Sequence, residues 1–183
     1  MSGGNGYKFI VLEGISGSGK TELGTRLSRQ ISAKYYTTPP SMFGKIREEA
    51  DRILCLRSRF LFYLSSVIQA SWEIGKILET QSVVCDKYLW STICYHRVYG
   101  LDVEMPPPIL YRKPDYTFLV VCEDEKRIER LFLRGAIKDA KQHSLRQENE
   151  RRCLIEFRKY LRHEIDNTVD GPQHAIDKIL AAI

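Results

Sequence analysis

Short apolar runs alternate along the chain with longer stretches in which apolar residues recur every three or four positions. The first run, KFIVLE in residues 8–13, is rich in β-branched residues and bounded by glycines, which predicts a buried strand. Further short runs predict strands at residues 34–38, 81–86, 115–122 and 164–167. Because the strands alternate with helical patterns, we predict an α/β fold with a parallel sheet covered by helices on both faces.

The stretches between the strands have the periodicity of helices. In residues 21–31, Leu23, Leu27 and Ile31 share one face of the predicted helix. Further helices are predicted after Ser41 and at residues 57–79, 91–99, 123–135, 144–162 and 172–183. The proline-rich residues 101–115 are expected to form an extended, exposed loop.

The helix predicted at residues 57–79 carries no charged side chain between Phe60 and Trp72. A helix that is apolar almost all round is buried on more than one side. We expect one face to pack on the sheet. The other face would be covered either by a second subunit, which would make the protein a homodimer, or by neighbouring helices of the same chain.

The length of the chain indicates the number of domains, and its charge distribution indicates the kind of ligand. The 183 residues fit a single domain spanning residues 1–183. The net charge is +5, and residues 126–162 alone hold twelve Lys or Arg against five Asp or Glu. Such a segment suits phosphate groups. Its aromatic residues lie at helical spacings typical of a core, so we expect no nucleic-acid binding.

Cysteine usage and hydropathy indicate where the protein works. The five cysteines form no CxxC pair, so neither a disulfide framework nor a zinc site is predicted, and free thiols suit the cytosol. The chain has no apolar stretch of about 18 residues and no signal-peptide pattern at its N-terminus. We therefore expect a cytoplasmic protein that does not bind membranes.

Residues 14–21, GISGSGKT, fit the pattern GxxxxGK[ST] and lie between a predicted strand and a predicted helix. The glycines let successive backbone N–H groups turn toward one point, and the helix adds its positive end. Lys20 would reach the β- and γ-phosphates of ATP, and the Thr21 hydroxyl would ligate Mg²⁺. The predicted phosphate-binding loop consists of Gly14, Ser16, Gly17, Ser18, Gly19, Lys20 and Thr21.

Asp86 ends the third predicted strand, which is where P-loop proteins hold Mg²⁺. Thr21 and Asp86 are therefore the predicted metal ligands. The alternative role for Asp86 is that of a helix cap.

The chain lacks the DxxG and NKxD segments of a GTPase. A motor-type ATPase would follow its strand acid with a catalytic Glu, whereas Lys87 follows here. The small size, the alternation of five strands with helices and the basic segment favour a small-molecule kinase, with residues at about 134–150 closing as a lid that excludes water.

Several segments resemble the thymidylate kinase family of nucleoside monophosphate kinases. FIVLEGISGSGKT resembles its first strand and P-loop, and FLFYLSSVIQASWEIGKIL followed by SVVCDKYLWSTICYHRVYG resembles its long helix and Asp-Arg-Tyr segment. KPDYTFLVV is similar to its Pro-Asp-Leu-Thr strand, and EIDNTVDGPQHAIDKIL to its last strand and helix.

The resemblance implies a P-loop NTPase fold with a five-stranded sheet of order 2-3-1-4-5. It also implies ATP as the phosphoryl donor, Mg²⁺, and often a dimer formed through the long helix. In catalysis, a lid arginine would act together with Lys20 and Asp86. Arg134 and Arg146 are the matching candidates for this arginine.

The departures from the family lie where the acceptor would bind. Ser16 replaces the P-loop Asp, residues 37–40 read TTPP in place of an Arg-Glu-Pro segment, and Lys87 replaces the arginine of Asp-Arg-Tyr. Ser65 and Ser66 replace the Asp-Arg pair of the long helix. Because arginine binds phosphate bidentately and lysine offers only a point charge, we expect the acceptor to be a nucleotide or nucleoside-like molecule other than dTMP.

Two neighbouring residues bear on the acceptor pocket. Tyr95 matches the family and would pack near the sugar of the acceptor, whereas His96 stands where the family often has Gln. The pocket is expected to contain Phe62, Tyr63, Ser66, Lys87, Tyr95 and Arg97.

Two other functions stay open. One is a kinase of a non-nucleotide alcohol, and the other is a nucleotide-binding module without turnover. An alcohol acceptor would need a general base, for which Asp86 and Glu13 are the nearest candidates in the sequence. For Glu13, the preferred interpretation is a structural residue at the end of its strand.

Overall fold

The computed structural model describes residues 6–135, 140–168 and 171–183. Its strands are β1 (Phe9–Glu13), β2 (Lys34–Thr37), β3 (Val83–Asp86), β4 (Tyr116–Val121) and β5 (Glu164–Asp166). Its helices are α1 (Lys20–Gln30), α2 (Ser41–Gly44), α3 (Arg47–Ile53), α4 (Leu56–Ile77), α5 (Leu89–Val98), α6 (Asp124–Leu133), α7 (Ala140–Arg158) and α8 (Gln173–Leu180), with a 3₁₀ turn η1 (Pro108–Leu110).

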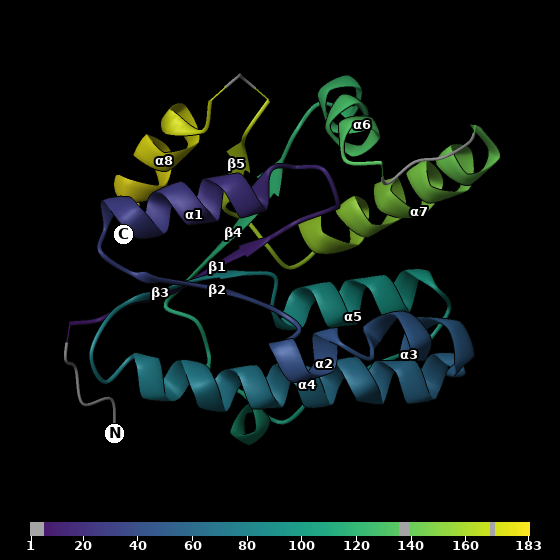
Figure 1. The fold of residues 1–183 in the computed structure, drawn as a ribbon, viewed down its shortest axis with the longest axis horizontal. Coiled ribbons are helices and arrows are strands. Elements are labelled where there is room, and N and C mark those ends of the chain that lie inside the picture. Colours follow the sequence, from purple (N-terminus) through teal and green to yellow (C-terminus); the bar gives the residue numbers. More distant parts are fainter. Residues whose placement is uncertain (1–5, 136–139, 169–170) are drawn as a thin grey trace.

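The five strands form one parallel sheet of order β2-β3-β1-β4-β5, which confirms the predicted fold class (Figure 1). In the centre of the sheet, Leu12 of β1 lies opposite Asp86 of β3 and Phe118 of β4. The carboxyl ends of β1 and β3 therefore meet at one edge of the sheet. This register brings the loop that follows β1 next to the acid that ends β3.

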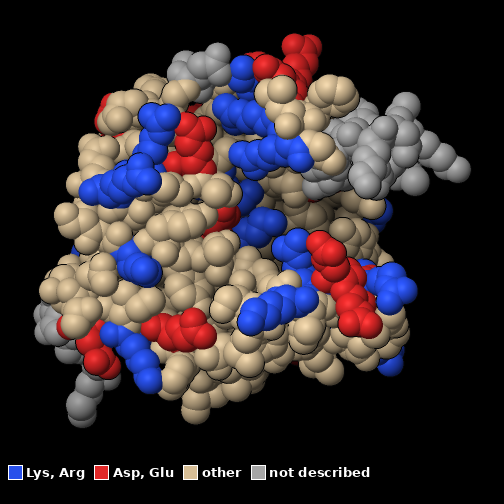
Figure 2. All heavy atoms as spheres, in the orientation of Figure 1, with Lys and Arg blue, Asp and Glu red and all other residues tan. Residues whose placement is uncertain are grey.

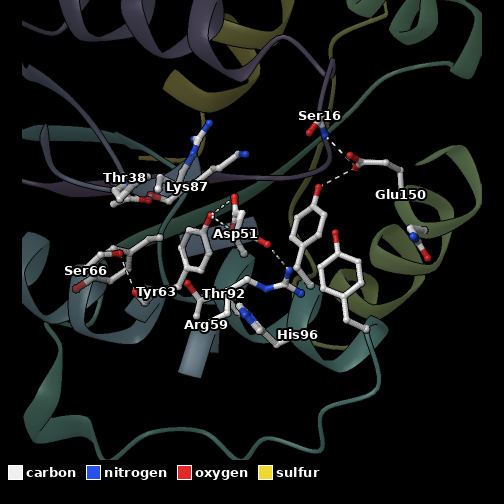
Figure 3. Close-up of a pocket in the computed structure, with 17 residues that line it drawn as sticks. Ser16, Thr38, Asp51, Arg59, Tyr63, Ser66, Lys87, Thr92, His96 and Glu150 are labelled. Atoms are coloured by element: carbon white, nitrogen blue, oxygen red, sulfur yellow. Dashed lines mark hydrogen bonds between the residues drawn. The ribbon is translucent and has the colours of Figure 1, made fainter. Parts of the chain in front are cut away.

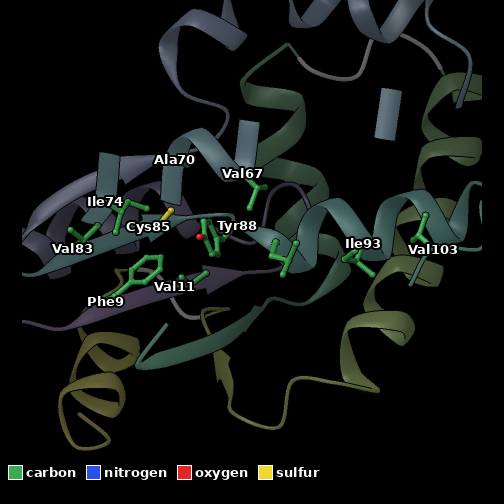
Figure 4. Close-up of a cluster of buried hydrophobic side chains, with 11 residues drawn as sticks. Phe9, Val11, Val67, Ala70, Ile74, Val83, Cys85, Tyr88, Ile93 and Val103 are labelled. Carbon is green, nitrogen blue, oxygen red and sulfur yellow. The ribbon is translucent and has the colours of Figure 1, made fainter. Parts of the chain in front are cut away.

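Helices cover the two faces of the sheet in different sets (Figure 1). Because side chains alternate along a strand, Ile10 and Leu12 of β1 point to the face covered by α1 and α8. Phe9 and Val11 point to the opposite face, where α4 packs (Figure 4). The α4 residues buried against the sheet are Val67, Ala70 and Ile74.

A third buried cluster attaches α7 to α5 and to the P-loop. Cys94 of α5 and Phe157 of α7 are fully buried in it, together with Ile15 of the P-loop and Leu119 of β4. These apolar contacts fix the C-terminal half of α7 beside the carboxyl edge of the sheet. The polar residues of α7 that face the P-loop are positioned by this packing.

The helices differ from the sequence prediction mainly at their ends. The helix expected after Ser41 is divided into α2 and α3, and α5 begins at Leu89, two residues before the predicted start. The predicted helix 144–162 is α7, which begins at Ala140 and ends at Arg158, where the chain turns toward β5. The proline-rich loop contains the short turn η1.

The outer side of α4 is partly open. Leu61 and Trp72 are 61% and 58% exposed, and the Lys76 ammonium lies 3.6 Å from the centre of the Trp72 ring. A homodimer formed through this helix stays a prediction. Within the described residues, no helix, including α4, combines the length and hydropathy that crossing a membrane requires.

Candidate active site

The P-loop connects the end of β1 to the start of α1. Gly17 and Gly19 have φ values of 85° and 86°, a left-handed conformation that suits glycine, and Gly19 is the N-cap residue of α1. The loop therefore turns back on itself in front of the positive end of α1. This is the arrangement that binds phosphate groups.

Lys20 is folded back onto the P-loop. Its Nζ donates to the Ile15 carbonyl oxygen at 2.7 Å and to Ser18 Oγ at 3.2 Å. Burial, and to a lesser extent the neighbouring charge of Lys87, lower the pKa of this ammonium group to about 8. Both of these acceptors are neutral oxygen atoms, which a buried cation is well placed to exchange for the oxygen atoms of a phosphate.

Thr21 and Asp86, the two predicted metal ligands, are in direct contact. Thr21 Oγ1 donates to Asp86 Oδ2 at 2.7 Å, and the Tyr35 hydroxyl donates to the same oxygen at 3.1 Å. The other carboxylate oxygen of Asp86, Oδ1, is buried and has no hydrogen-bond partner in the described part of the chain. Oxygen ligands beside a P-loop fit Mg²⁺, which binds one or two protein oxygens and completes its shell with phosphate and water.

Glu13 is fully buried and holds the start of α5. Its Oε1 accepts hydrogen bonds from the backbone N–H groups of Tyr88 and Trp90 at 3.1 and 3.0 Å, and its Oε2 accepts from Ser91 Oγ. Burial raises the pKa of this carboxyl group to about 7, although the hydrogen bonds from Ser91 work against the shift. These contacts fit the preferred interpretation of Glu13 as a structural residue. They also explain why α5 begins at Leu89, two residues before the predicted start.

A cavity of about 650 Å³ opens next to the P-loop, with a volume typical of small-molecule sites (Figure 3). Ser16 of the P-loop and four of the predicted pocket residues line it: Tyr63, Ser66, Lys87 and Tyr95. Lys and Arg side chains border a hollow near the middle of the face shown in Figure 2.

Two residues expected in the pocket lie elsewhere. Arg97 donates to the Val103 carbonyl oxygen at 2.8 Å and to Glu156 at 3.2 Å, because it is two residues from Tyr95 and so lies on the other side of α5. Phe62 packs edge-on against Phe43, and neither Phe62 nor Arg97 lines the cavity.

Four other charged residues line the cavity and were missed from the sequence, and three of them belong to α3 and α4. Arg47 and Asp51 of α3 share one face of that helix, and Arg59 comes from the first turn of α4. The spacing of Arg47 and Asp51 was a visible signal. The side on which α3 packs was not, because it depends on how α2 and α3 fold over the edge of the sheet.

Glu150 of α7 also lines the cavity, and it is 4% exposed. Its Oε2 accepts hydrogen bonds from the backbone N–H of Ser16 at 3.1 Å and from the Tyr95 hydroxyl at 2.7 Å. A carboxylate therefore lies beside position 16 although residue 16 itself is a serine. No local pattern in the sequence indicates this contact, since 134 residues separate the two groups.

The lid arginines are only partly within the described structure. Arg134 follows the last residue of α6 and is exposed. The side chain of Arg146 and residues 136–139 of the expected lid lie outside the described residues. The roles of both arginines and the lid at 134–150 stay predictions.

Comparison with known proteins identifies the family to which this fold and P-loop belong. A family model described as thymidylate kinase matches residues 12–170. The chain belongs to the thymidylate kinase family. It is a P-loop kinase of the nucleoside monophosphate kinase type, a phosphotransferase that acts on a small molecule, and this family generally uses ATP and Mg²⁺.

Curated relatives agree with this family, and solved structures agree with the fold. A probable thymidylate kinase of Methanocaldococcus jannaschii is 34% identical over 67% of this chain and 69% of its own. One from Methanococcus maripaludis strain C7 is 29% identical over 96% of this chain and 94% of its own. The thymidylate kinase structure from Candida albicans superposes with a TM-score of 0.75 at 19% identity, covering 97% of this chain and 91% of that one. The structure from Ehrlichia chaffeensis gives a TM-score of 0.66 at 19% identity, covering 96% and 98%. At this identity, the two structures support the fold alone.

Proposed function

We propose that the protein transfers the γ-phosphoryl group of ATP to a nucleotide-like acceptor that already carries a phosphate, and that dTMP is a poor acceptor. The observation that supports this most directly is the set of cations in the cavity. Arg47, Arg59 and Lys87 line the same cavity as Ser16 of the P-loop. These three cations outnumber the two carboxylates that also line the cavity, Asp51 and Glu150, so an anionic acceptor would complete the charge balance and a neutral alcohol would not.

The base end of the cavity supports an acceptor other than dTMP. Ser66, at the position of the family arginine, is buried and donates its hydroxyl to the Tyr63 carbonyl oxygen at 2.7 Å. His96 Nδ1 lies 2.7 Å from the Thr92 carbonyl oxygen, and burial lowers the pKa of the ring. A neutral ring that donates through Nδ1 leaves Nε2 as an acceptor, so positions 66 and 96 themselves supply no guanidinium group to this end of the cavity.

The chain's own residues support phosphoryl transfer in the following way. Lys20 would exchange its contacts with the P-loop for the β- and γ-phosphates of ATP, and a lid arginine would neutralise further developing charge. Mg²⁺, held by the Thr21 hydroxyl and the Asp86 carboxylate, would supply a positive charge to the donor phosphates. A phosphate acceptor is already anionic, so no general base is needed.

A second candidate function follows from Glu150. This carboxylate lies in the cavity and contacts the backbone of Ser16, so it is better placed to accept a proton from an alcohol than Glu13, which is bound to the start of α5. If the acceptor were an alcohol, Glu150 would be the candidate base.

The test is transfer of label from γ-labelled ATP with Mg²⁺ to a panel of acceptors. The panel contains dTMP, the other nucleoside monophosphates, free nucleosides and sugar alcohols, and Lys20→Ala is the control. We expect label on a monophosphate other than dTMP, lost in the control. Strong labelling of dTMP would contradict the proposed acceptor, and labelling of alcohols alone would favour the second candidate. No labelling with any acceptor would favour a nucleotide-binding module.

A further inference from the structure

Two consecutive tyrosines in the edge strand β2 point to opposite faces of the sheet. Tyr35 pairs in register with Val84 of β3, and Tyr36 pairs with Cys85. Because side chains alternate along a strand, one tyrosine faces α1 and the other faces α4. The Tyr36 hydroxyl donates to Glu73 of α4 at 2.6 Å. The Tyr35 hydroxyl donates instead to Asp86 Oδ2, at 3.1 Å.

The ring of Tyr35 lies close against α1. A methyl group placed on Gly24 of α1 would come within 2.9 Å of Tyr35 Cε2, which is closer than side chains normally approach. The absence of a side chain at Gly24 therefore gives the tyrosine ring room to cross from the edge strand to Asp86. The ring is held between β2 and α1, so its hydroxyl has little freedom to move away.

The two carboxylate oxygen atoms of Asp86 differ in how many hydrogen bonds they accept. Oδ2 accepts from both Thr21 and Tyr35, whereas Oδ1 is buried without a hydrogen-bond partner among the described residues. Two donors on one oxygen fix the rotation of the carboxylate about its axis. A buried carboxylate oxygen without a partner is costly, and a cation or the water bound to it would remove that cost.

We propose that Tyr35 is a positioning residue for the metal site, holding the Asp86 carboxylate so that Oδ1 faces the cation. This rests on the proposed roles of Thr21 and Asp86 as the metal-binding pair. The Thr21 hydroxyl would bind the metal ion through its oxygen and can still donate its hydrogen to Oδ2, so Tyr35 is a second described donor to that oxygen. Because its ring is held between β2 and α1, the Tyr35 hydroxyl would help to keep the orientation of Asp86 when a metal ion binds, as other hydrogen bonds do that orient metal ligands.

The test compares two variants that each remove one hydroxyl group. Tyr35→Phe removes the donor to Asp86, and Tyr36→Phe is the matched control because it removes the donor to Glu73 on the other face. The affinity for Mn²⁺ in the presence of ADP is measured from the electron paramagnetic resonance of free Mn²⁺. We expect Tyr35→Phe to weaken Mn²⁺ binding by about tenfold and Tyr36→Phe to leave it at the wild-type value.

Two other outcomes distinguish a wrong role for Tyr35 from a wrong assignment of the metal site. Equal Mn²⁺ affinities in the two variants, with wild-type thermal stability, would overturn the role of Tyr35 while leaving the metal site intact. A wild-type protein that binds no Mn²⁺ with ADP would overturn the roles of Thr21 and Asp86, and the inference with them. A second variant, Gly24→Ala, keeps the Tyr35 hydroxyl but displaces its ring, and we expect it to weaken Mn²⁺ binding in the same direction.

Discussion

The backbone N–H of Ser16 donates a hydrogen bond to the side chain of Glu150 at 3.1 Å, which joins the P-loop to α7. Thymidylate kinase-like sequences usually carry an aspartate at the position of Ser16. The carboxylate beside this part of the loop is therefore supplied here by a distant helix. The same oxygen of Glu150 also accepts from the Tyr95 hydroxyl at 2.7 Å, so one carboxylate holds both the P-loop and a side chain of the acceptor cavity.

Glu150→Gln is expected to lower kcat/KM for the acceptor by about tenfold, because charge-assisted hydrogen bonds to Tyr95 and Ser16 become neutral ones. The KM for ATP should change much less. Glu148→Gln, on an exposed part of the same helix, is the matched control and should behave like the wild type. Steady-state kinetics with varied acceptor measures both, and equal values for the two variants would argue against this role of Glu150.

Removing either arginine of the cavity should weaken acceptor binding. Arg47→Ala and Arg59→Ala are each expected to raise the acceptor KM by about 10- to 100-fold, because each removes one charge-assisted contact of about 1.5–3 kcal/mol. The control is Arg52→Ala, since Arg52 is an exposed arginine of α3 that does not line the cavity. If Arg52→Ala raised the acceptor KM as much as Arg47→Ala, a general loss of positive charge would explain the effect instead.

Lys20→Ala should greatly slow transfer while preserving the fold. Among the described residues, the hydrogen bonds of Lys20 Nζ go to the P-loop residues Ile15 and Ser18 and join no other element, so we expect the far-UV circular dichroism spectrum to stay unchanged. The kcat should fall by about 10²–10³ or more, the cost of removing one preorganised donor to transition-state charge. Transfer at near wild-type rates would exclude this P-loop from the reaction.

Glu13 should make stability depend on pH. Burial raises the pKa of Glu13 from its ordinary value of 4.5 to about 7 in the folded protein. Between these two values the folded state binds more protons than the unfolded state, so the free energy of unfolding falls as pH rises through this window. For this group alone, the loss is on the order of 3 kcal/mol.

The check is a comparison of the wild type with Glu13→Gln, which cannot ionise at this position. Denaturant unfolding at about pH 5 and about pH 8 gives the free energies. The free energy of unfolding of the wild type minus that of the variant should be smaller at the higher pH than at the lower pH. A difference that stays constant with pH would show that Glu13 does not titrate in this range.

The donor half of the site could be predicted from the sequence because its residues are adjacent in the chain or end neighbouring strands. The P-loop is one continuous motif, and Asp86 lies beside it because β1 and β3 are parallel neighbours. Arg47, Arg59 and Glu150 come from three helices, and their meeting point depends on how those helices pack. Apolar periodicity indicates the buried face of a helix, but it does not say which distant element the polar face will meet.

Arg97 shows a different limit. It is close in sequence to Tyr95, and this proximity suggested that both line one pocket. Two helical positions are about 200° apart around the axis, so Tyr95 faces the P-loop and Arg97 faces Tyr160 and Glu156. If Tyr95 is known to face the P-loop, the angle between the two positions places Arg97 on the other side of the helix and corrects the prediction.

The most direct test of the proposed function is the kind of bond that the transferred phosphoryl group makes in the product. The product formed from ATP, Mg²⁺ and the best acceptor of the panel is examined by ³¹P nuclear magnetic resonance. A phosphate acceptor gives a phosphoanhydride, seen as two coupled phosphorus signals, and this is the result we predict for a cavity lined by Arg47, Arg59 and Lys87. A phosphomonoester, seen as a single uncoupled signal, would show that an alcohol is the acceptor and would contradict the proposal.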